Sequence, residues 1–337
     1  MLTSLQVCVV GAGKMGADHI DRLSRRIVGA EVSAVVDIDI SRAKKVIEAV
    51  PSAVAVTDIG QVLEGENVNA LLIATPGPLH EEILLQVKSR GWPILCEKPL
   101  APDSASAWRI VESELEGKTK HIQVGFMRRF DAEYQRLRKL ITSGELGKLL
   151  MLHFYHRNPE TPTSFTNEML INDAVAHEFD AIRYFTGEEL KSIQVRLGRT
   201  TRYAHSGQHD PQHVLIETET GLLADVEVLI NSRFGYQVAT QAVFEDGVVS
   251  IGGDTGPYIR SAGHWWGEIT PNFVERFKAA YDREVQSWVD AARRGEVGGP
   301  TAWDGYAAAT CAETGVAALH SGEKVKVALK DKPSIYN

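Results

Sequence analysis

The stretch that decides the fold lies near the N-terminus, where residues 7–16 read VCVVGAGKMG. Its apolar start predicts a β-strand, and the pattern G-x-G-x-x-G follows where that strand turns into a helix. Gly11 allows the tight turn, Gly13 admits a pyrophosphate against bare backbone, and Gly16 lets helix and strand pack closely. The free N–H groups at the start of the helix favour the phosphates. This stretch therefore predicts a dinucleotide site.

The second predicted strand ends at Asp37, 21 positions after Gly16. A carboxylate at this position accepts hydrogen bonds from both hydroxyls of an adenosine ribose. It would also repel the additional phosphate of NADP, and residues 38–40 supply no arginine, so NAD is the expected cofactor. The alternative is that Asp37 only caps the helix or turn that follows.

Up to about residue 124, short apolar runs alternate with amphipathic helical stretches, which is typical of βαβ units and a parallel sheet. Residues 1–124 are therefore expected to form an α/β, NAD-binding Rossmann domain. One helix between the first two strands is expected to bury a single stripe, formed by Met15, Ile20, Leu23 and Ile27. The strands are predicted at Leu5 to Val10, Glu31 to Val36, Ala53 to Val56, Ala70 to Ala74, Pro93 to Cys96 and His121 to Val124.

The carboxyl ends of these strands carry residues suited to binding. Ligands of open parallel sheets bind just beyond those ends. We therefore expect one crevice to collect Gly11, Asp37, Thr75-Pro76, Glu97-Lys98 and Gly125.

After Gly125 the pattern changes to strict alternation, which suits half-buried antiparallel strands. It is clearest in Ile193, Val195 and Leu197 and again in Val214, Ile216 and Thr218. Residues 125–337 are therefore expected to form an α+β domain for substrate binding and oligomerisation, with a large, mainly antiparallel open sheet. Turns with positive φ are predicted at Thr220-Gly221 and Asp246-Gly247. Helices are predicted from Ile171 to Phe185, from a start at Thr270-Pro271, and from about Ala302 to Ser321, the last rich enough in small residues to pack closely on another element.

Composition excludes several classes of protein. The chain of 337 residues has 36 Lys and Arg against 44 Asp and Glu, a formal charge of -8, so nucleic acid is not an expected partner. No apolar stretch is long enough for a membrane span, and the N-terminus has no basic segment followed by an apolar one, so a cytoplasmic protein is expected. Cys8, Cys96 and Cys311 lie far apart in apolar segments and suit reduced, buried thiols.

Three side chains are candidates for proton chemistry. Lys98 follows a buried strand and precedes Pro99, which holds its backbone extended, or in a cis bond, and lets the side chain point into the crevice. Asp173 and His177 are four apart on a predicted helix, so histidine could take a proton while the carboxylate orients it. The alternatives are an ordinary surface lysine and a solvated helix face.

Two further groups of residues are discounted. His205, His209 and His213 are spaced by four, but Gly207 and Pro211 interrupt any helix there, so no metal site is expected. A zinc site at Asp173 and His177 is not expected either, because the sequence suggests no third ligand within reach. The basic run Arg129, Arg136, Arg138 and Lys139 is interpreted as a solvated helix face.

Four short motifs resemble the glucose-fructose oxidoreductase / inositol dehydrogenase (Gfo/Idh/MocA) family. Residues 91–100, GWPILCEKPL, carry its Glu-Lys-Pro signature, and residues 74–80, ATPGPLH, resemble its Ala-Thr-Pro-x-x-x-His segment. Residues 125–131, GFMRRFD, and 156–159, HRNP, are narrower and resemble the inositol 2-dehydrogenases within that family. The similarity covers nearly the whole chain. One departure is Ala174, where related enzymes often have Ser or Thr.

The resemblance implies roles for individual residues. His177 would accept the proton, Asp173 would position it, and Lys98 would tune the site. The polyol pocket would be lined by Met127, Arg128, His156 and Tyr236. The residues expected to bind the cofactor are Gly11, Gly13, Lys14, Met15, Gly16, Asp37, Thr75, Pro76 and Glu97.

The resemblance also implies an activity. The chain is expected to oxidise a secondary hydroxyl of myo-inositol to 2-keto-myo-inositol with NAD and to form a homotetramer. The alternatives are another inositol isomer or a pyranose sugar, a glycosidase that oxidises its substrate transiently, and a non-catalytic regulator that senses NAD on the same fold.

Overall fold

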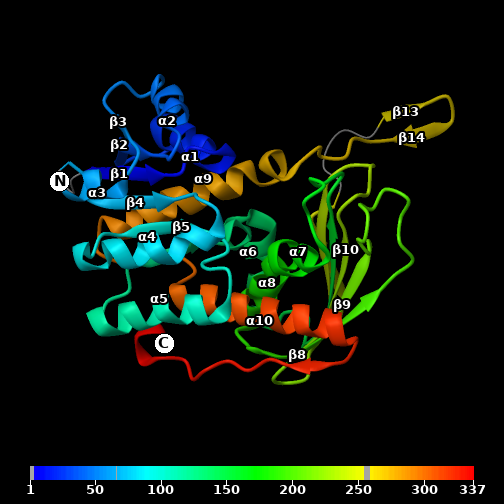
Figure 1. The fold of residues 1–337 in the computed structure, drawn as a ribbon. Helices are drawn as coiled ribbons and strands as arrows, with labels where there is room; N and C mark the ends of the chain where they lie inside the picture. The colour runs from blue at the N-terminus through cyan, green and yellow to red at the C-terminus, as the bar shows by residue number, and fades with distance from the viewer. Residues whose placement is uncertain (1–3, 66, 254–258) are drawn as a thin grey trace. The chain divides into compact units, whose positions relative to one another are not determined.

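The computed structural model describes residues 4–65, 67–253 and 259–337 (Figure 1). The chain divides into two compact units that interleave along the sequence. The first unit comprises Met1–Met127, Tyr281–Ala309 and Lys330–Asn337, and the second comprises Arg128–Ala280 and Thr310–Leu329. The chain therefore returns to the first unit twice after leaving it. A single boundary after residue 124 assigns these two later segments to the second domain. The predicted boundary itself stays a prediction.

The first unit is built on a parallel sheet, which in the described residues has the strand order β3-β2-β1-β4-β5-β6. This order reverses between β1 and β4, and in doubly wound sheets ligands bind at such a switch point. All six predicted strands are confirmed, with ends shifted by at most one residue. Their bounds are β1 Leu5–Val10, β2 Ala30–Val36, β3 Val54–Val56, β4 Ala70–Ile73, β5 Ile94–Glu97 and β6 Ile122–Gly125.

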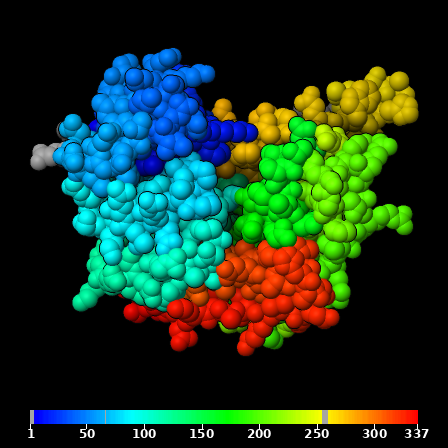
Figure 2. All heavy atoms as spheres, viewed as in Figure 1, coloured from blue at the N-terminus to red at the C-terminus, as the bar shows by residue number. Residues whose placement is uncertain are grey.

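Helices cover this sheet and close its core. The buried stripe predicted for the first helix is confirmed at Ile20, Leu23 and Ile27, whereas Met15 is half-buried. Val285 and Trp288, from the later part of α9 (Phe273–Ala292), complete the same core. Figure 1 shows α4 and α5 side by side, and the blue and cyan atoms of this unit pack closely in Figure 2. The other helices are α1 Lys14–Arg25, α2 Ile40–Ile47, α3 Ile59–Leu63, η1 Gly77–Leu79, α4 His80–Val87, η2 Lys88–Arg90, α5 Ser104–Gly117 and η5 Ser334–Tyr336.

The second unit contains a larger sheet, with the order β12-β11-β7-β10-β9-β8-β15 among the described residues. The β7–β10 pair is parallel and the other neighbours are antiparallel, so the predicted mainly antiparallel sheet is confirmed. A separate hairpin pairs β13 Ile259–Ser261 with β14 His264–Trp266. The strands of the large sheet are β7 Leu149–Arg157, β8 Leu190–Leu197, β9 Gln212–Thr218, β10 Leu223–Leu229, β11 Gln237–Phe244, β12 Val248–Ile251 and β15 Val325–Lys326.

One of the two predicted glycine turns is confirmed and the other is wrong in its detail. Gly221 has a φ of +91°, as expected between β9 and β10. Gly247 does not have a positive φ. The Phe244 N–H donates to the Gly247 carbonyl over 2.8 Å, so Glu245 and Asp246 make the turn and Gly247 directly precedes β12.

The helices of the second unit correct two predictions. The segment predicted as one α-helix from Ile171 is α7 Asn167–Met169, then a π-helix, η4 Leu170–Val175, then α8 Ala176–Thr186. Thr270-Pro271 does not start α9; Asn272 does, because its side-chain oxygen accepts the Glu275 N–H over 3.1 Å. The remaining helices are η3 Met127–Phe130, α6 Ala132–Ser143 and α10 Ala302–Ser321, the last with the bounds predicted from the sequence.

Close packing of α10 is confirmed at Gly315. A Cβ on this glycine would lie 2.6 Å from the Ile171 Cγ2, so only glycine fits against the π-helix there. The π-helix is in turn the segment that carries Asp173. The small residue on α10 thus allows this helix to approach the segment that carries Asp173 closely.

The three cysteines are free and buried, as predicted. Within the part of the chain that the structure describes, no helix has the length and apolar character that crossing a membrane requires. The cytoplasmic location expected from the sequence stays a prediction.

Candidate functional site

The glycine turn between β1 and α1 is closely packed at two of its glycines and open at the third. Gly11 has a φ of +95°, and a Cβ on it would lie 2.8 Å from the Ala74 carbonyl oxygen. A Cβ on Gly16 would lie 1.8 Å from the Gly11 carbonyl oxygen, whereas one on Gly13 would meet nothing within 4 Å. The first and third glycines therefore serve chain packing and the second leaves open space. The turn fits a dinucleotide's pyrophosphate at the start of α1.

Asp37 holds this turn as well as facing the cavity. Its Oδ2 accepts the Ala12 N–H over 2.7 Å, and its Oδ1 accepts the Asp39 N–H over 2.9 Å. Each carboxylate oxygen can accept a second hydrogen bond, so both can still bind ribose hydroxyls. The alternative of a cap holds for the turn, through the Asp39 N–H, but not for the helix: α2 is capped by Asp39, whose side chain accepts the Ser41 and Arg42 N–H groups.

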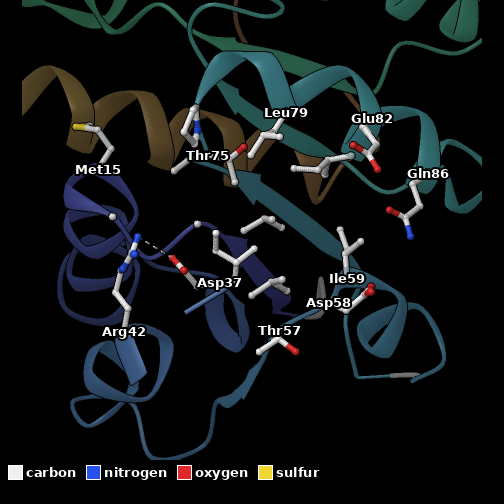
Figure 3. Close-up of a pocket in the computed structure, with 18 of the residues that line it drawn as sticks. Met15, Asp37, Arg42, Thr57, Asp58, Ile59, Thr75, Leu79, Glu82 and Gln86 are labelled. Carbon is white, nitrogen blue, oxygen red and sulfur yellow. Dashed lines mark ion pairs between the residues drawn. The ribbon is translucent and has the colours of Figure 1, made fainter. Parts of the chain in front are cut away.

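A cavity of about 610 Å³ lies at the carboxyl ends of the strands in the first unit (Figure 3). Leu79, Glu82, Ile83 and Gln86 border it on the α4 side. Gly16 and Glu97 do not line it, and the assignment of cofactor-binding roles stays a prediction. Of the residues predicted to bind the cofactor, those that line the cavity are Gly11, Gly13, Lys14, Met15, Asp37, Thr75 and Pro76.

Arg42, to which the sequence motifs gave no role, also lines this cavity. It lies in the first turn of α2, five positions after Asp37 and just beyond residues 38–40, which contain no arginine. Its Nη1 lies 3.6 Å from the Asp37 Oδ2 (Figure 3). Its position in the first turn of the helix after the second strand is the sequence signal that indicates it.

Glu97 is occupied inside the first unit. Its Oε1 lies 2.7 Å from the Nε2 of His19, a fully buried histidine on α1. The Arg22 Nη1 donates to the His19 Nδ1 over 3.0 Å, so the His19 proton is on Nε2 and is donated to Glu97. The other Glu97 oxygen accepts the Lys98 N–H over 3.3 Å. Glu97 therefore links the helix of the glycine turn to the backbone of Lys98, a role that the sequence did not indicate.

Lys98 follows directly on β5, and the Lys98–Pro99 bond is cis, one of the two geometries expected. The side chain of His80 is buried. Its Nδ1 lies 2.8 Å from the Pro99 carbonyl oxygen, and its Nε2 lies 2.8 Å from the Thr75 carbonyl oxygen. Desolvation lowers the pKa of His80 against the opposing effect of the two carbonyls, and the neutral ring donates to only one of them. The loops after β4 and β5 are thus held together through one imidazole.

In the second unit, Arg128 and His156 share a carboxylate that the sequence analysis assigned no role. Arg128 forms an ion pair with Glu178, and the His156 Nδ1 lies 3.0 and 3.1 Å from the two Glu178 oxygens. All three side chains are buried. Burial alone would raise the pKa of Glu178, but the charges of Arg128 and His156 outweigh it and lower the pKa to about 2. Glu178 is therefore ionised throughout the physiological range.

This carboxylate fixes the tautomer of His156. The Glu178 oxygens, which only accept hydrogen bonds, lie closer to the His156 Nδ1 than the Arg128 Nη2 does at 3.3 Å, so the shorter contacts favour a proton on Nδ1. In the neutral ring, Nε2 is then an acceptor. The Arg128–Glu178–His156 triad is therefore suited to binding a ligand that offers hydroxyl groups.

His177 lies next to this triad. Its ring centroid is 6.5 Å from that of His156, and its residue is 9% exposed, near the start of α8. Asp173 lies four residues earlier and is half-buried on the π-helix. π-turns are frequent at functional sites because they re-aim side chains within a helix. The structure thus places His177, His156, Arg128 and Glu178 in one region of the second unit.

Tyr236 and Met127 are both buried. The Tyr236 ring meets Phe277 edge-on at 6.5 Å, and the Arg128 guanidinium lies 5.7 Å from the same Phe277 ring. Burial raises the pKa of Tyr236, so its hydroxyl stays protonated. Phe277 therefore connects two of the predicted substrate residues, whereas Met127 belongs to the first unit.

The interpretation of the basic run was wrong for one residue. The Arg129 Nε donates to the Asp180 Oδ2 over 2.9 Å, and Asp180 is buried on α8. Arg136, Arg138 and Lys139 are exposed on α6, as predicted. The difference arises because Arg129 precedes α6 and faces α8.

The three histidines that were discounted as a metal site have separate contacts. The His205 Nε2 lies 3.0 Å from the Thr161 O, the His209 Nδ1 lies 3.3 Å from the Thr200 Oγ1, and the His213 Nε2 lies 3.2 Å from the Asp225 Oδ1. Among residues 4–65, 67–253 and 259–337, no group of three or more His, Cys, Asp or Glu side chains is arranged to hold a metal ion.

Comparison with known proteins shows matches along the chain. Residues 5–126 match the model described as oxidoreductase family, NAD-binding Rossmann fold, and residues 134–250 match the GFO/IDH/MocA C-terminal domain. The chain is 65% identical over 337 residues to an inositol 2-dehydrogenase from Arthrobacter sp. (strain FB24), and the match covers 100% of both proteins.

Solved structures agree with these matches. The myo-inositol dehydrogenase of Lactobacillus casei, solved in complex with NAD(H) and myo-inositol, has a TM-score of 0.96 and 33% identity, covering 99% of this chain and 100% of that one. A scyllo-inositol dehydrogenase from the same organism has a TM-score of 0.89 at 22% identity, covering 96% of this chain and 99% of that one. The second likeness shows the fold alone.

Proposed function

Because the chain belongs to the Gfo/Idh/MocA oxidoreductase family, whose first domain is an NAD-binding Rossmann fold, we propose that it oxidises myo-inositol to 2-keto-myo-inositol. The observation that carries this function is the full-length identity of 65% to the Arthrobacter inositol 2-dehydrogenase. The glycine turn and Asp37 would hold NAD, which would supply the acceptor for the hydride of the ring carbon. The chain's own residues bind the ring and take the hydroxyl proton.

We propose that the His177 imidazole accepts the proton of the substrate hydroxyl. As the carbon loses its hydride, the hydroxyl oxygen loses its proton to His177, and the C–O bond becomes a carbonyl. Asp173, four residues earlier, orients the ring and stabilises the imidazolium that forms. Lys98 supplies a positive charge for the developing alkoxide, a role that rests on the family resemblance. The joint action of Lys98 with Asp173 and His177 is part of this proposal.

We assign substrate binding to the Arg128–Glu178–His156 triad together with Tyr236. The ring of inositol carries a hydroxyl on every carbon, and each hydroxyl can donate and accept. Arg128 offers N–H donors, His156 offers its Nε2, and the protonated Tyr236 offers a hydroxyl. Met127 supplies an apolar contact. Such a mixture of donors and acceptors suits a polyol better than an apolar or anionic substrate.

A panel of substrates tests the function. NADH formation, followed by its absorbance, is expected with myo-inositol at a kcat/KM at least about tenfold above that for scyllo-inositol or a pyranose such as glucose, because one mismatched hydroxyl leaves a buried polar group unpaired. Steady NADH production from free inositol would exclude a glycosidase that reduces its substrate again. NAD binding without NADH formation from any polyol would favour the non-catalytic regulator and overturn the proposal.

We further propose that the chain assembles as a homotetramer, with the outer face of the large sheet as one interface. Tyr155, Leu215 and Leu223 lie on that face and are 37%, 40% and 50% exposed, and the strand pairing places them on neighbouring strands. Light scattering after size exclusion is expected to give four times the chain mass. Leu223→Glu is expected to reduce that mass, whereas Val28→Glu, at a 74% exposed position in the first unit, is the matched control. A wild-type monomer would contradict this assembly.

A further inference from the structure

Arg42 and Asp37 form a loose pair at the wall of the dinucleotide cavity (Figure 3). The Arg42 Nη1 lies 3.6 Å from the Asp37 Oδ2, and its Nη2 lies 3.7 Å from the Asp39 Oδ2. Both distances exceed hydrogen-bond length, and the Arg42 side chain is 48% exposed. The guanidinium is therefore held near Asp37 by charge, and its N–H donors are not committed to either carboxylate.

The position of this pair matters because Asp37 is the carboxylate that would receive the ribose hydroxyls. A 2′-phosphate on that ribose would face the Asp37 charge, and placing two like charges together is costly. A guanidinium beside them offsets part of that cost, and its planar fork suits phosphate oxygens. Discrimination between the two dinucleotides thus depends on two side chains with opposite effects.

Lys14 is the other basic residue among those that line the cavity. It is the first residue of α1, directly after the glycine turn, where the pyrophosphate would lie. Arg42 belongs instead to α2, which follows the strand that ends at Asp37. The 2′ position of the ribose is therefore assigned to Arg42 and not to Lys14.

We propose that Arg42 is a specificity-determining residue that lets this chain bind NADP in addition to NAD, with Asp37 holding the preference for NAD. The inference rests on dinucleotide binding, which family membership supports, and not on the identity of the polyol. Its consequence is that removing the Asp37 charge is sufficient to invert the preference, because the phosphate-binding arginine is already in place.

Binding measurements on the full-length chain test this without any turnover. Affinities for NADH and NADPH are measured by titration calorimetry or nicotinamide fluorescence for the wild type, Arg42→Ala, Asp37→Ser and the double variant. Wild-type NADPH binding is expected to be about 10- to 100-fold weaker than NADH binding, not absent. Arg42→Ala is expected to weaken NADPH at least about tenfold and NADH by no more than about threefold.

The double variant separates the effect of Arg42 on NADPH binding from that of Asp37. Asp37→Ser is expected to bind NADPH more tightly than NADH, and adding Arg42→Ala is expected to remove that gain. Lys45→Ala, on an exposed residue of the same helix outside the cavity lining, removes the same charge and controls for net electrostatics. Because Asp37 also holds the Ala12 N–H, unfolding is followed for each variant, and Arg42→Ala alone still decides the question if Asp37→Ser does not fold.

Equal loss of both dinucleotides in Arg42→Ala, or the same loss in Lys45→Ala, would overturn the inference and leave the proposed function intact. NADPH binding preserved in the double variant would also overturn it, because the phosphate would then be held elsewhere. Failure of the wild type to bind NADH would overturn both proposals together.

Discussion

Replacing His177 with alanine is expected to lower kcat for inositol oxidation about 1,000-fold, within the range that a positioned general base contributes. The hydroxyl proton would then have to leave to water, which the buried surroundings of His177 and His156 admit poorly. Affinity for NADH is expected to stay within about twofold, because the glycine turn and Asp37 belong to the first unit whereas His177 belongs to the second. Loss of turnover with binding retained is the signature of a role in the chemical step.

Single-turnover NADH absorbance and fluorescence titration measure these two quantities separately. In His177→Ala the residual rate is expected to rise with pH, because hydroxide replaces the missing base. His209→Ala is a matched control, since His209 is an exposed histidine of the same unit outside the proposed site. A kcat within tenfold of the wild type would remove His177 from the mechanism. Loss of NADH binding would instead point to a damaged fold.

Patterns local in the sequence predicted much of the fold and several residues that line the cavity of the first unit. The glycine turn and Asp37 are separated by only one helix, and their spacing is fixed by the βαβ geometry. The bounds of α10 were also predictable, because the composition of the chain changes sharply at both ends of this helix. The position of Arg42 at the cavity could also be predicted from the sequence, because the first turn of the helix after the second strand borders the cavity.

The polar partners in the second unit could not be predicted in this way. Glu178 is adjacent to His177 in the chain, but it lies 50 positions from Arg128 and 22 from His156. Apolar periodicity shows that α8 has a buried face without showing which charges meet on it. The π-helix was also missed, since apolar periodicity indicates a helical segment without showing which hydrogen-bond spacing its backbone has over six residues. Long-range pairing and backbone detail therefore required the structure.

Glu178 provides the second large expected effect, this time on stability. Glu178→Ala is expected to lower the free energy of unfolding by about 3–5 kcal/mol, because it leaves the buried Arg128 without its counter-charge. Glu160→Ala is the matched control. Its carboxylate pairs with Arg233 over 2.8 Å, but the two side chains are 69% and 43% exposed, and such a pair contributes at most about 1 kcal/mol. Denaturant unfolding at pH 7 measures both changes.

Glu178→Gln adds a dependence on pH that follows from the lowered pKa. In the folded wild type the pKa is about 2, below its ordinary value of 4.5, so ionisation stabilises the fold above pH 4.5 and this contribution is lost as the pH falls towards 2. The difference in unfolding free energy between wild type and Glu178→Gln is therefore expected to shrink over that window, because a protonated Glu178 resembles glutamine. The KM for inositol is expected to rise about tenfold in the variant, since His156 loses the carboxylate that fixes its tautomer. A difference that stays constant from pH 7 to pH 2 would show that Glu178 is not the ionised centre of this triad.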